Sequence, residues 1–88
     1  MEEKRVKIEN ETGIHARPAS MIVQKANSFE SDILILKDNT EANAKSIMGI
    51  MSLGISQSTE IIIRAEGEDE TKAVEEITEL IESGFGEK

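Results

Sequence analysis

The 88-residue sequence contains no cysteine, tryptophan or tyrosine, and its only aromatic residues are Phe29 and Phe85. Without cysteine the chain forms neither disulfides nor thiolate metal sites. With two aromatic side chains it lacks a stacking platform for nucleic-acid bases. No apolar run approaches the roughly 20 residues of a membrane-spanning helix, and residues 1–5 lead into no signal-like apolar segment. We therefore expect a soluble cytoplasmic protein with no membrane insertion.

The charge is strongly one-sided, because 18 acidic residues outnumber 10 lysines and arginines for a formal net charge of −8. This balance argues against direct nucleic-acid binding, which depends on cations that neutralise phosphates. Residues 13–29 and 42–59 contain no acidic residue, yet they hold His15, Arg17, Lys25 and Lys45. Either helices and turns simply differ in composition, or the two windows form a surface that meets anionic groups or acidic partners.

Hydrophobic periodicity predicts one domain, residues 1–88, without linkers or repeats. Alternation around Val6 and Ile8 indicates a strand, and further strands are expected at 33–36, at a short segment containing Ala42 and Ala44, and at 60–66. Helices are expected over about 16–27, over about 47–53 after Ser46, and from residue 69 or 70 to Gly84. We expect the tail 85–88 to fray. The order β-α-β-β-α-β-α favours an α+β fold with helices on one face of an antiparallel or mixed sheet.

The only histidine and the only proline lie together in the stretch from Gly13 to Pro18. Proline is tolerated in the first turn of a helix, so His15 is expected just before a helix N-terminus, with Arg17 in or beside the first turn. The backbone N–H groups there, from Ala16 and Arg17, and the positive end of the helix dipole favour an anion. An arginine fork also suits phosphate oxygens.

The sequence lacks the residue patterns of the common catalytic and metal-binding sites. No Ser-His-Asp order, metal-spaced histidine cluster or glycine-rich phosphate loop is present. One arginine and a helix end suit a group that holds a phosphate loosely and passes it on. We therefore expect a carrier rather than an enzyme, with no metal and no cofactor.

The run Gly13-Ile14-His15-Ala16-Arg17-Pro18-Ala19 resembles the phosphorylation site of HPr, the histidine-containing phosphocarrier family of the bacterial phosphoenolpyruvate-dependent sugar phosphotransferase system. The resemblance implies an open-faced sandwich of four antiparallel strands under three helices. It implies that His15 accepts a phosphoryl group on Nδ1 from phosphorylated enzyme I and passes it to a histidine of an enzyme IIA domain. Arg17 would stabilise the charge in both steps.

Ser46 is expected to cap the second helix with its hydroxyl. The surrounding Lys45-Ser46-Ile47-Met48-Gly49 and Met51-Ser52-Leu53-Gly54-Ile55 also resemble the regulatory region of HPr from low-GC Gram-positive bacteria. That resemblance implies phosphorylation of Ser46 by HPr kinase/phosphorylase, slower phosphorylation of His15, and docking onto a catabolite control regulator.

The second helix carries more apolar residues than one buried face needs. Either the loop 55–59 buries the surplus, or Ile47, Met48 and Met51 stay partly exposed as an adaptable docking patch, which is our prediction. In the HPr family this helix and the first one form the shared partner surface. That likeness places Ser20, Ile47, Met48, Met51 and Gly54 around His15.

Two alternatives to a regulated phosphocarrier follow from the same residues. One is a purely regulatory HPr-like adaptor or a paralogue in a nitrogen-type phosphotransfer chain, although the regulatory relatives lack the active histidine and this chain has His15. The other is an anion-binding module without transfer chemistry. We expect a monomer in each case.

Overall fold

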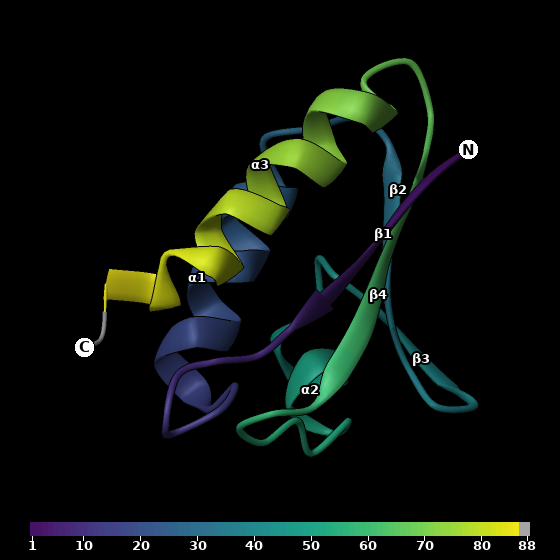
Figure 1. The fold of residues 1–88 in the computed structure, drawn as a ribbon. Helices are drawn as coiled ribbons and strands as arrows, with labels where there is room; N and C mark the ends of the chain where they lie inside the picture. The colour runs from purple at the N-terminus through teal and green to yellow at the C-terminus, as the bar shows by residue number, and fades with distance from the viewer. Residues whose placement is uncertain (87–88) are drawn as a thin grey trace.

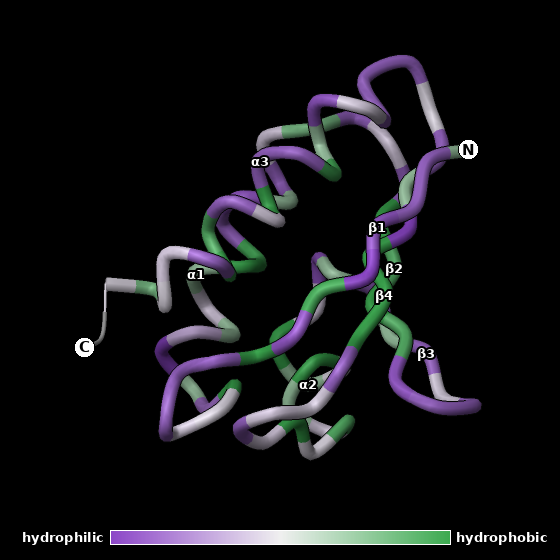
Figure 2. Tube along the Cα trace, in the orientation of Figure 1, coloured by the Kyte–Doolittle hydropathy of each residue, from purple (hydrophilic) through white to green (hydrophobic). Residues whose placement is uncertain are grey.

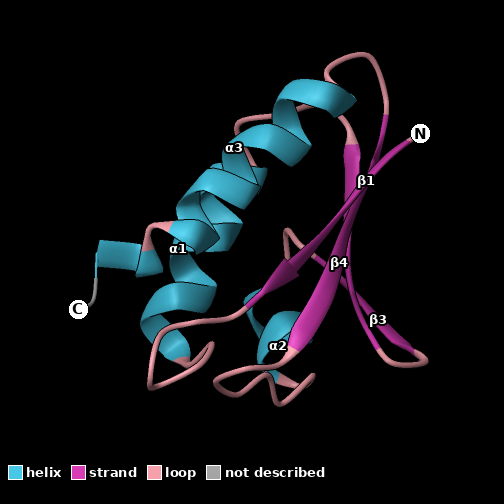
Figure 3. Cartoon of the chain, in the orientation of Figure 1, coloured by secondary structure: helices cyan, strands magenta, loops and turns pink. Residues whose placement is uncertain are grey.

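The computed structural model describes residues 1–86 and shows the expected α+β order along the chain (Figures 1 and 3). Its elements are β1 (Glu2–Lys7), α1 (Ala16–Ala26), β2 (Asp32–Lys37), β3 (Thr40–Asn43), α2 (Ile47–Met51), β4 (Glu60–Glu66), α3 (Glu70–Glu82) and a 3₁₀ turn, η1 (Gly84–Gly86). The four strands form one antiparallel sheet in the order β1-β4-β2-β3. The three α-helices lie on one side of it, which confirms the open-faced sandwich (Figure 1).

Side chains alternate across the sheet as the period of two requires. In β4, Ile61, Ile63 and Ala65 are buried under the helices, while Ile62 and Arg64 on the other face are half-buried. Hydrophobic segments of the strands and helices accordingly turn toward each other (Figure 2). The core is completed by the inner faces of α1 and α3, including Ala19, Ile22, Ala26, Ala73, Val74, Ile77 and Ile81. Leu80 is only partly buried at its edge.

The open face of the sheet carries apolar residues that are only half-buried. Leu34 and Leu36 of β2 are half-buried, and Leu36 pairs in register with Ile62 of β4. Arg64 forms an ion pair with Glu3 across the β1–β4 ladder. Charged neighbours therefore flank a short apolar strip.

Element boundaries differ from the predicted ones at several places. Ala44 was predicted in a strand but follows the end of β3 at Asn43, and Ile8 follows the end of β1 at Lys7, although both side chains are buried. β1 begins at Glu2, well before Val6, because its backbone pairs with β4 over six residues regardless of which side chains are charged. α2 ends at Met51 and not near Leu53, since Ser52 already caps it and Gly54 has a left-handed φ of 63°. The expected starts at Ala16 and Ser46 and the whole of strand 60–66 are confirmed.

The prediction that the tail frays is wrong for Phe85. Its side chain is fully buried, and its backbone adopts φ 58° between Gly84 at 72° and Gly86 at 76°. Glycine adopts this conformation without penalty, so the two glycines let the chain turn back and insert the ring into the core. Residues 87–88 lie outside the described part.

Within residues 1–86, no helix has both the length and the apolar character that crossing a membrane requires.

Candidate functional site

His15 is the N-cap residue of α1, as predicted. Its backbone is extended (φ −95°, ψ −161°), and its carbonyl accepts the first hydrogen bond of the helix, from Ala19 N–H at 2.9 Å. The N–H groups of Ala16 and Arg17 precede that bond and point out of the helix end. Pro18 is the third helical residue, where it supplies no N–H and its φ suits the helix. Helix geometry thus places two amides and the positive end of the dipole at the start of α1.

The surroundings of His15 favour an anion from outside. His15, Ala16 and Arg17 are exposed, and the first turn of α1 contains no acidic residue. The two acid-free windows of the sequence contain α1 and α2, and these helices pack against each other. The windows therefore share one side of the molecule.

The loop before His15 is held by backbone contacts. Ile14 N–H donates to Ile55 O at 2.9 Å, and Asn10 Nδ2 donates to Gly13 O at 2.7 Å. A Cβ at Gly13 would lie 2.5 Å from Ile55 O and 2.8 Å from Ser56 Cα, and φ there is +64°. Only glycine allows this approach without a shift of the backbone, and the approach fixes where α1 begins.

Arg17 reaches across the molecule to the C-terminal turn. Its Nη1 donates to the carbonyl oxygen of Phe85 at 3.2 Å, in a partly buried contact between residues 68 positions apart. Sequence reasoning missed this contact because it treated residue 85 as part of a frayed tail. The only signal available was a single aromatic residue between two glycines.

Ser46 caps α2 as expected. Its Oγ accepts from Gly49 N–H at 3.0 Å, and the residue is half-buried. The neighbouring Lys45 turns its ammonium group to Phe29 O at 2.9 Å. The hydroxyl thus has a structural role at the start of α2.

The second helix divides its apolar residues between core and solvent. Ile50 and Leu53 are buried, whereas Ile47 is 40%, Met48 77% and Met51 41% exposed. The predicted exposure is confirmed, and the alternative that the loop 55–59 covers the three is wrong. We call Ile47, Met48 and Met51 the α2 patch.

Two further residues were predicted beside this patch. Gly54 is exposed after α2, where Lys37 Nζ donates to Leu53 O at 3.0 Å and to Gly54 O at 3.1 Å. Ser20 is half-buried on α1. Ser20 therefore lies on α1 and Gly54 just after α2, both within the acid-free windows of the sequence.

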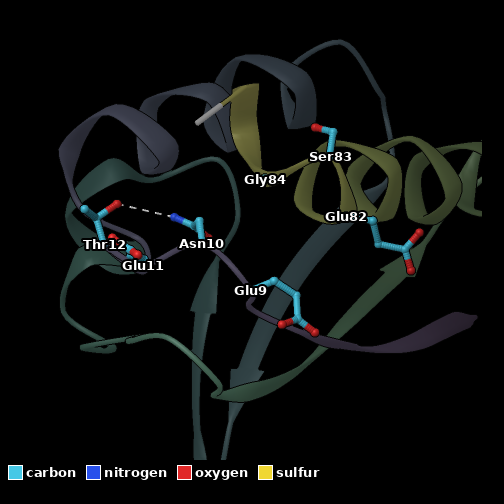
Figure 4. Close-up of a pocket in the computed structure, with 7 residues that line it drawn as sticks. All are labelled: Glu9, Asn10, Glu11, Thr12, Glu82, Ser83 and Gly84. Atoms are coloured by element: carbon cyan, nitrogen blue, oxygen red, sulfur yellow. Dashed lines mark hydrogen bonds between the residues drawn. The ribbon is translucent and has the colours of Figure 1, made fainter. Parts of the chain in front are cut away.

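A pocket of about 520 Å³ lies between the loop that follows β1 and the end of α3 (Figure 4). Carboxylates of Glu9, Glu11 and Glu82 line it. Their negative charge opposes a phosphate. The pocket is therefore unsuited to the anion chemistry expected at His15, and among residues 1–86 no acidic or histidine cluster is arranged to hold a metal.

At the opposite end of the sheet, Asp69 binds the loop between α1 and β2. Its carboxylate accepts from Ser31 Oγ, from Ser31 N–H at 3.0 Å and from Glu30 N–H at 2.9 Å. These bonds, the Ser31 hydroxyl first and then the Glu30 amide, hold the pKa of Asp69 below its ordinary value. We call this arrangement the Asp69 clamp.

The outer face of α3 is acidic. Glu75, Glu79 and Glu82 are exposed. Two of its carboxylates make surface ion pairs instead, Glu76 with Lys25 at 3.5 Å and Glu70 with the N-terminal ammonium at 2.7 Å. The second contact lowers the pKa of Glu70 and raises that of the N-terminal amine.

Known proteins resemble this chain over almost its whole length. The family described as "PTS HPr component phosphorylation site" matches residues 2–83. The HPr-like protein Crh of Bacillus subtilis (strain 168) is 45% identical over 82 residues, which cover 93% of this chain and 96% of Crh. The crystal structure of HPr-C-His from Thermoanaerobacter tengcongensis superposes with a TM-score of 0.97 at 53% identity, covering 100% of this chain and 99% of the other.

A crystal structure of Bacillus subtilis Crh, described as a swapped-domain dimer and as a catabolite repression protein, matches with a TM-score of 0.77 at 44% identity and covers 96% and 97% of the two chains. The family match, these identities and the shared fold agree with the motif around the N-terminus of α1. This chain belongs to the HPr family of phosphocarrier proteins of the phosphotransferase system (PTS).

Proposed function

We propose that this chain relays a phosphoryl group through His15, from phosphorylated enzyme I to sugar-specific enzyme IIA domains. The observation that carries the proposal is the exposed imidazole at the N-cap of α1, beside the amides of Ala16 and Arg17 and in a first turn without acids. Such a helix end attracts an anion through its N–H groups and its dipole.

The transfer itself makes and breaks one N–P bond. The lone pair of a neutral His15 ring nitrogen, Nδ1 by family resemblance, attacks the phosphorus of the donor phosphohistidine, and the donor nitrogen keeps the electron pair of the broken bond. The second ring nitrogen of His15 keeps its proton. The amides and the Arg17 guanidinium would stabilise the charge on the three phosphoryl oxygens.

A surface site without metal ligands or an enclosing pocket suits a carrier. Because His15 is exposed, donor and acceptor proteins can both reach it, and only a few hydrogen bonds would stabilise the phosphoryl group beyond its N–P bond. The chain would then act as an acceptor and donor in a transferase chain and would not be an enzyme by itself.

Incubation with enzyme I and phosphoenolpyruvate tests the relay. The chain should gain one acid-labile phosphate, detected by mass before and after acid treatment, and His15→Ala should gain none. His15 is exposed, so this variant should keep its stability within about 0.5 kcal/mol. A wild-type chain that stays unmodified would exclude the relay.

We propose the α2 patch, with Ser20 and Gly54, as the docking surface for enzyme I, enzyme IIA domains, HPr kinase/phosphorylase and a catabolite control regulator. Exposed methionines adapt to several partners. Met48→Asp should weaken binding to these partners at unchanged thermal stability, measured by titration calorimetry. Thr71→Asp, an equal charge on an exposed position of α3, should bind normally; equal losses in both variants would point to net charge alone.

Ser46 is the proposed regulatory site. HPr kinase/phosphorylase with ATP should add an acid-stable phosphate that adds negative charge beside the docking surface and slows phosphorylation of His15. Ser46→Ala should remain unmodified, and it should also lose about 1 kcal/mol of stability with the cap. Ser52→Ala, a matched exposed serine at the end of α2, should be phosphorylated like the wild type. Phosphate on Ser46→Ala would place the site elsewhere.

The second candidate is a purely regulatory adaptor or a nitrogen-type paralogue, which the likeness to Crh favours. The enzyme I experiment separates the two, since an adaptor would take phosphate only at Ser46. We propose a monomer as the working state, and sedimentation at several concentrations tests it against a dimer of the kind described for Crh.

A further inference from the structure

The sulfur atoms of this chain belong to four methionines, because the sequence contains no cysteine. Two of them, Met48 and Met51, lie on α2 and are exposed. Of the other two, Met1 is exposed at the start of the chain, whereas Met21 is partly buried against the core. Thiol chemistry is therefore excluded, and half of the oxidisable sulfur lies in the α2 patch.

Neither methionine of the patch is needed to hold α2 in place. Ile50 and Leu53 are buried and anchor this segment in the core. The Ser46 hydroxyl caps the first turn, and Lys37 Nζ donates to Leu53 O at 3.0 Å after the last one. A polar group added to either methionine would therefore face solvent and leave the packing of the helix intact.

We propose that Met48 and Met51 are oxidation sites, at which oxidants of the hydroperoxide class weaken docking to the partner proteins. This inference rests on the proposed docking function of the α2 patch. The sulfur lone pair attacks an oxygen of the hydroperoxide, and the O–O bond breaks. The thioether, oxidised by two electrons, becomes a sulfoxide, and the hydroperoxide leaves as water or an alcohol. Reduction by two thiols reverses the step, forming a disulfide and water.

Oxidation changes what the patch presents to a partner. A methionine thioether is apolar and flexible, whereas the sulfoxide carries a polar oxygen that accepts hydrogen bonds. A partner that covers the side chain must bury this oxygen, which is unfavourable where no donor meets it. Each sulfoxide should weaken docking by about ten-fold. The transfer site at His15 contains no sulfur and should be unchanged.

Met1 is an internal control for this inference. It is 63% exposed, which lies between the values for Met48 and Met51. Its ammonium group, however, pairs with Glu70 at the start of α3, and the N-terminus and α2 lie far apart in Figure 1. Hydrogen peroxide should therefore oxidise Met1 as well, with no effect on docking.

Limited treatment with hydrogen peroxide, followed by mass analysis of peptides, measures oxygen uptake at each methionine. Met48 and Met51 should react several-fold faster than Met21, because water and peroxide reach their sulfur atoms freely. This measurement needs no partner protein. Thermal unfolding of the oxidised chain should be unchanged, since the core keeps its contacts.

Phosphoryl transfer from enzyme I then measures docking. In the oxidised wild type, the KM for this chain should rise about ten-fold or more with kcat unchanged. Methionine sulfoxide reductase with a dithiol should restore the KM. The double variant Met48→Leu/Met51→Leu keeps an apolar patch together with Met1 and Met21, and peroxide should leave its KM unchanged. If enzyme I does not phosphorylate the wild type, titration calorimetry with HPr kinase/phosphorylase measures docking in place of the KM.

Three results would overturn the oxidation sites: equal reactivity of Met21 and the α2 methionines, unchanged docking after oxidation, or an equal loss of docking in the double variant. A large fall in thermal stability of the oxidised chain would also overturn them, because unfolding would then explain the weaker docking. Met48→Asp separates this inference from the docking proposal. If Met48→Asp docks normally, the docking surface itself is wrong, whereas weak docking of Met48→Asp with normal docking of the oxidised chain excludes the oxidation sites alone.

Discussion

Backbone N–H groups gather at two places in the molecule, the Asp69 clamp and the N-terminus of α1. The two places differ in the side chain that lies beside those groups. In the Asp69 clamp, the amides of Glu30 and Ser31 bind a carboxylate of the same chain. At the N-terminus of α1, the first turn contains no acidic residue, and the side chain at the N-cap is an imidazole. The clamp therefore contains a carboxylate of the same chain, and the first turn of α1 contains no acidic residue.

The Asp69 clamp contributes to stability, whereas the start of α1 is the site of the proposed phosphoryl transfer. A resident carboxylate fixes the loop between α1 and β2 to the start of α3 and binds nothing further. A helix end without one gives up the favourable energy of an acidic residue in the first turn, about 0.3–1 kcal/mol. The comparison predicts that an anion added at the start of α1 mainly lowers the rate of phosphoryl transfer. Removal of the carboxylate from the Asp69 clamp should mainly lower stability.

Removal of the cation at the α1 end should have the largest effect. Arg17→Ala should slow phosphoryl transfer about a hundred-fold, because one donor to the phosphoryl oxygens is lost. Stability should change little, by about 1 kcal/mol for the bond to Phe85 O. Rapid-quench kinetics and thermal unfolding measure the two quantities, and an unchanged transfer rate would show that Arg17 has another role.

A resident carboxylate at the α1 end should have an intermediate effect. Ala16→Glu places an acid in the first turn and should stabilise the protein by about 0.3–1 kcal/mol. The same carboxylate repels the incoming phosphoryl group, so transfer should slow by roughly ten-fold. Thr71→Glu in the first turn of α3 is the control, because it should leave transfer unchanged. A faster or equal rate in Ala16→Glu would contradict the comparison.

Removal of the resident anion should have the smallest effect on transfer and a visible effect on stability. The pKa of Asp69 is lowered in the folded protein, so its contribution is fully present above the unfolded pKa of about 3.9 and is lost as the pH falls through the lower folded value. Asp69→Asn should be less stable at pH 7 and lose less stability on acidification below about pH 4 than the wild type. Urea unfolding at several pH values tests this, and parallel curves would exclude the clamp as the cause.

Most of the fold could be predicted because local signals agree with it. Ser46 caps a helix by its own hydroxyl, and the alternation along residues 60–66 places Ile61 and Ile63 in the core without reference to the rest of the chain. The extent of β1 could not be predicted in the same way, since pairing with β4 determines where the strand begins.

Part of the candidate site could also be predicted from local sequence signals. Pro18 and the apolar periodicity that follows it predicted His15 at a helix start, where the structure has it. The contact between Arg17 and Phe85 joins residues 68 positions apart, and it depends on a ring packing into a core whose shape no local pattern describes. The polar, glycine-containing end of the chain suggested fraying, whereas burial of the Phe85 ring orders the backbone there.

The missing side chain at Gly13 has a mechanical meaning for encounters between proteins. The backbone ahead of His15 lies close to Ile55 and Ser56, and Ile14 N–H donates to Ile55 O. The segment that follows α2 and the start of α1 are therefore held together, so a protein that bound the α2 patch would also be placed relative to His15.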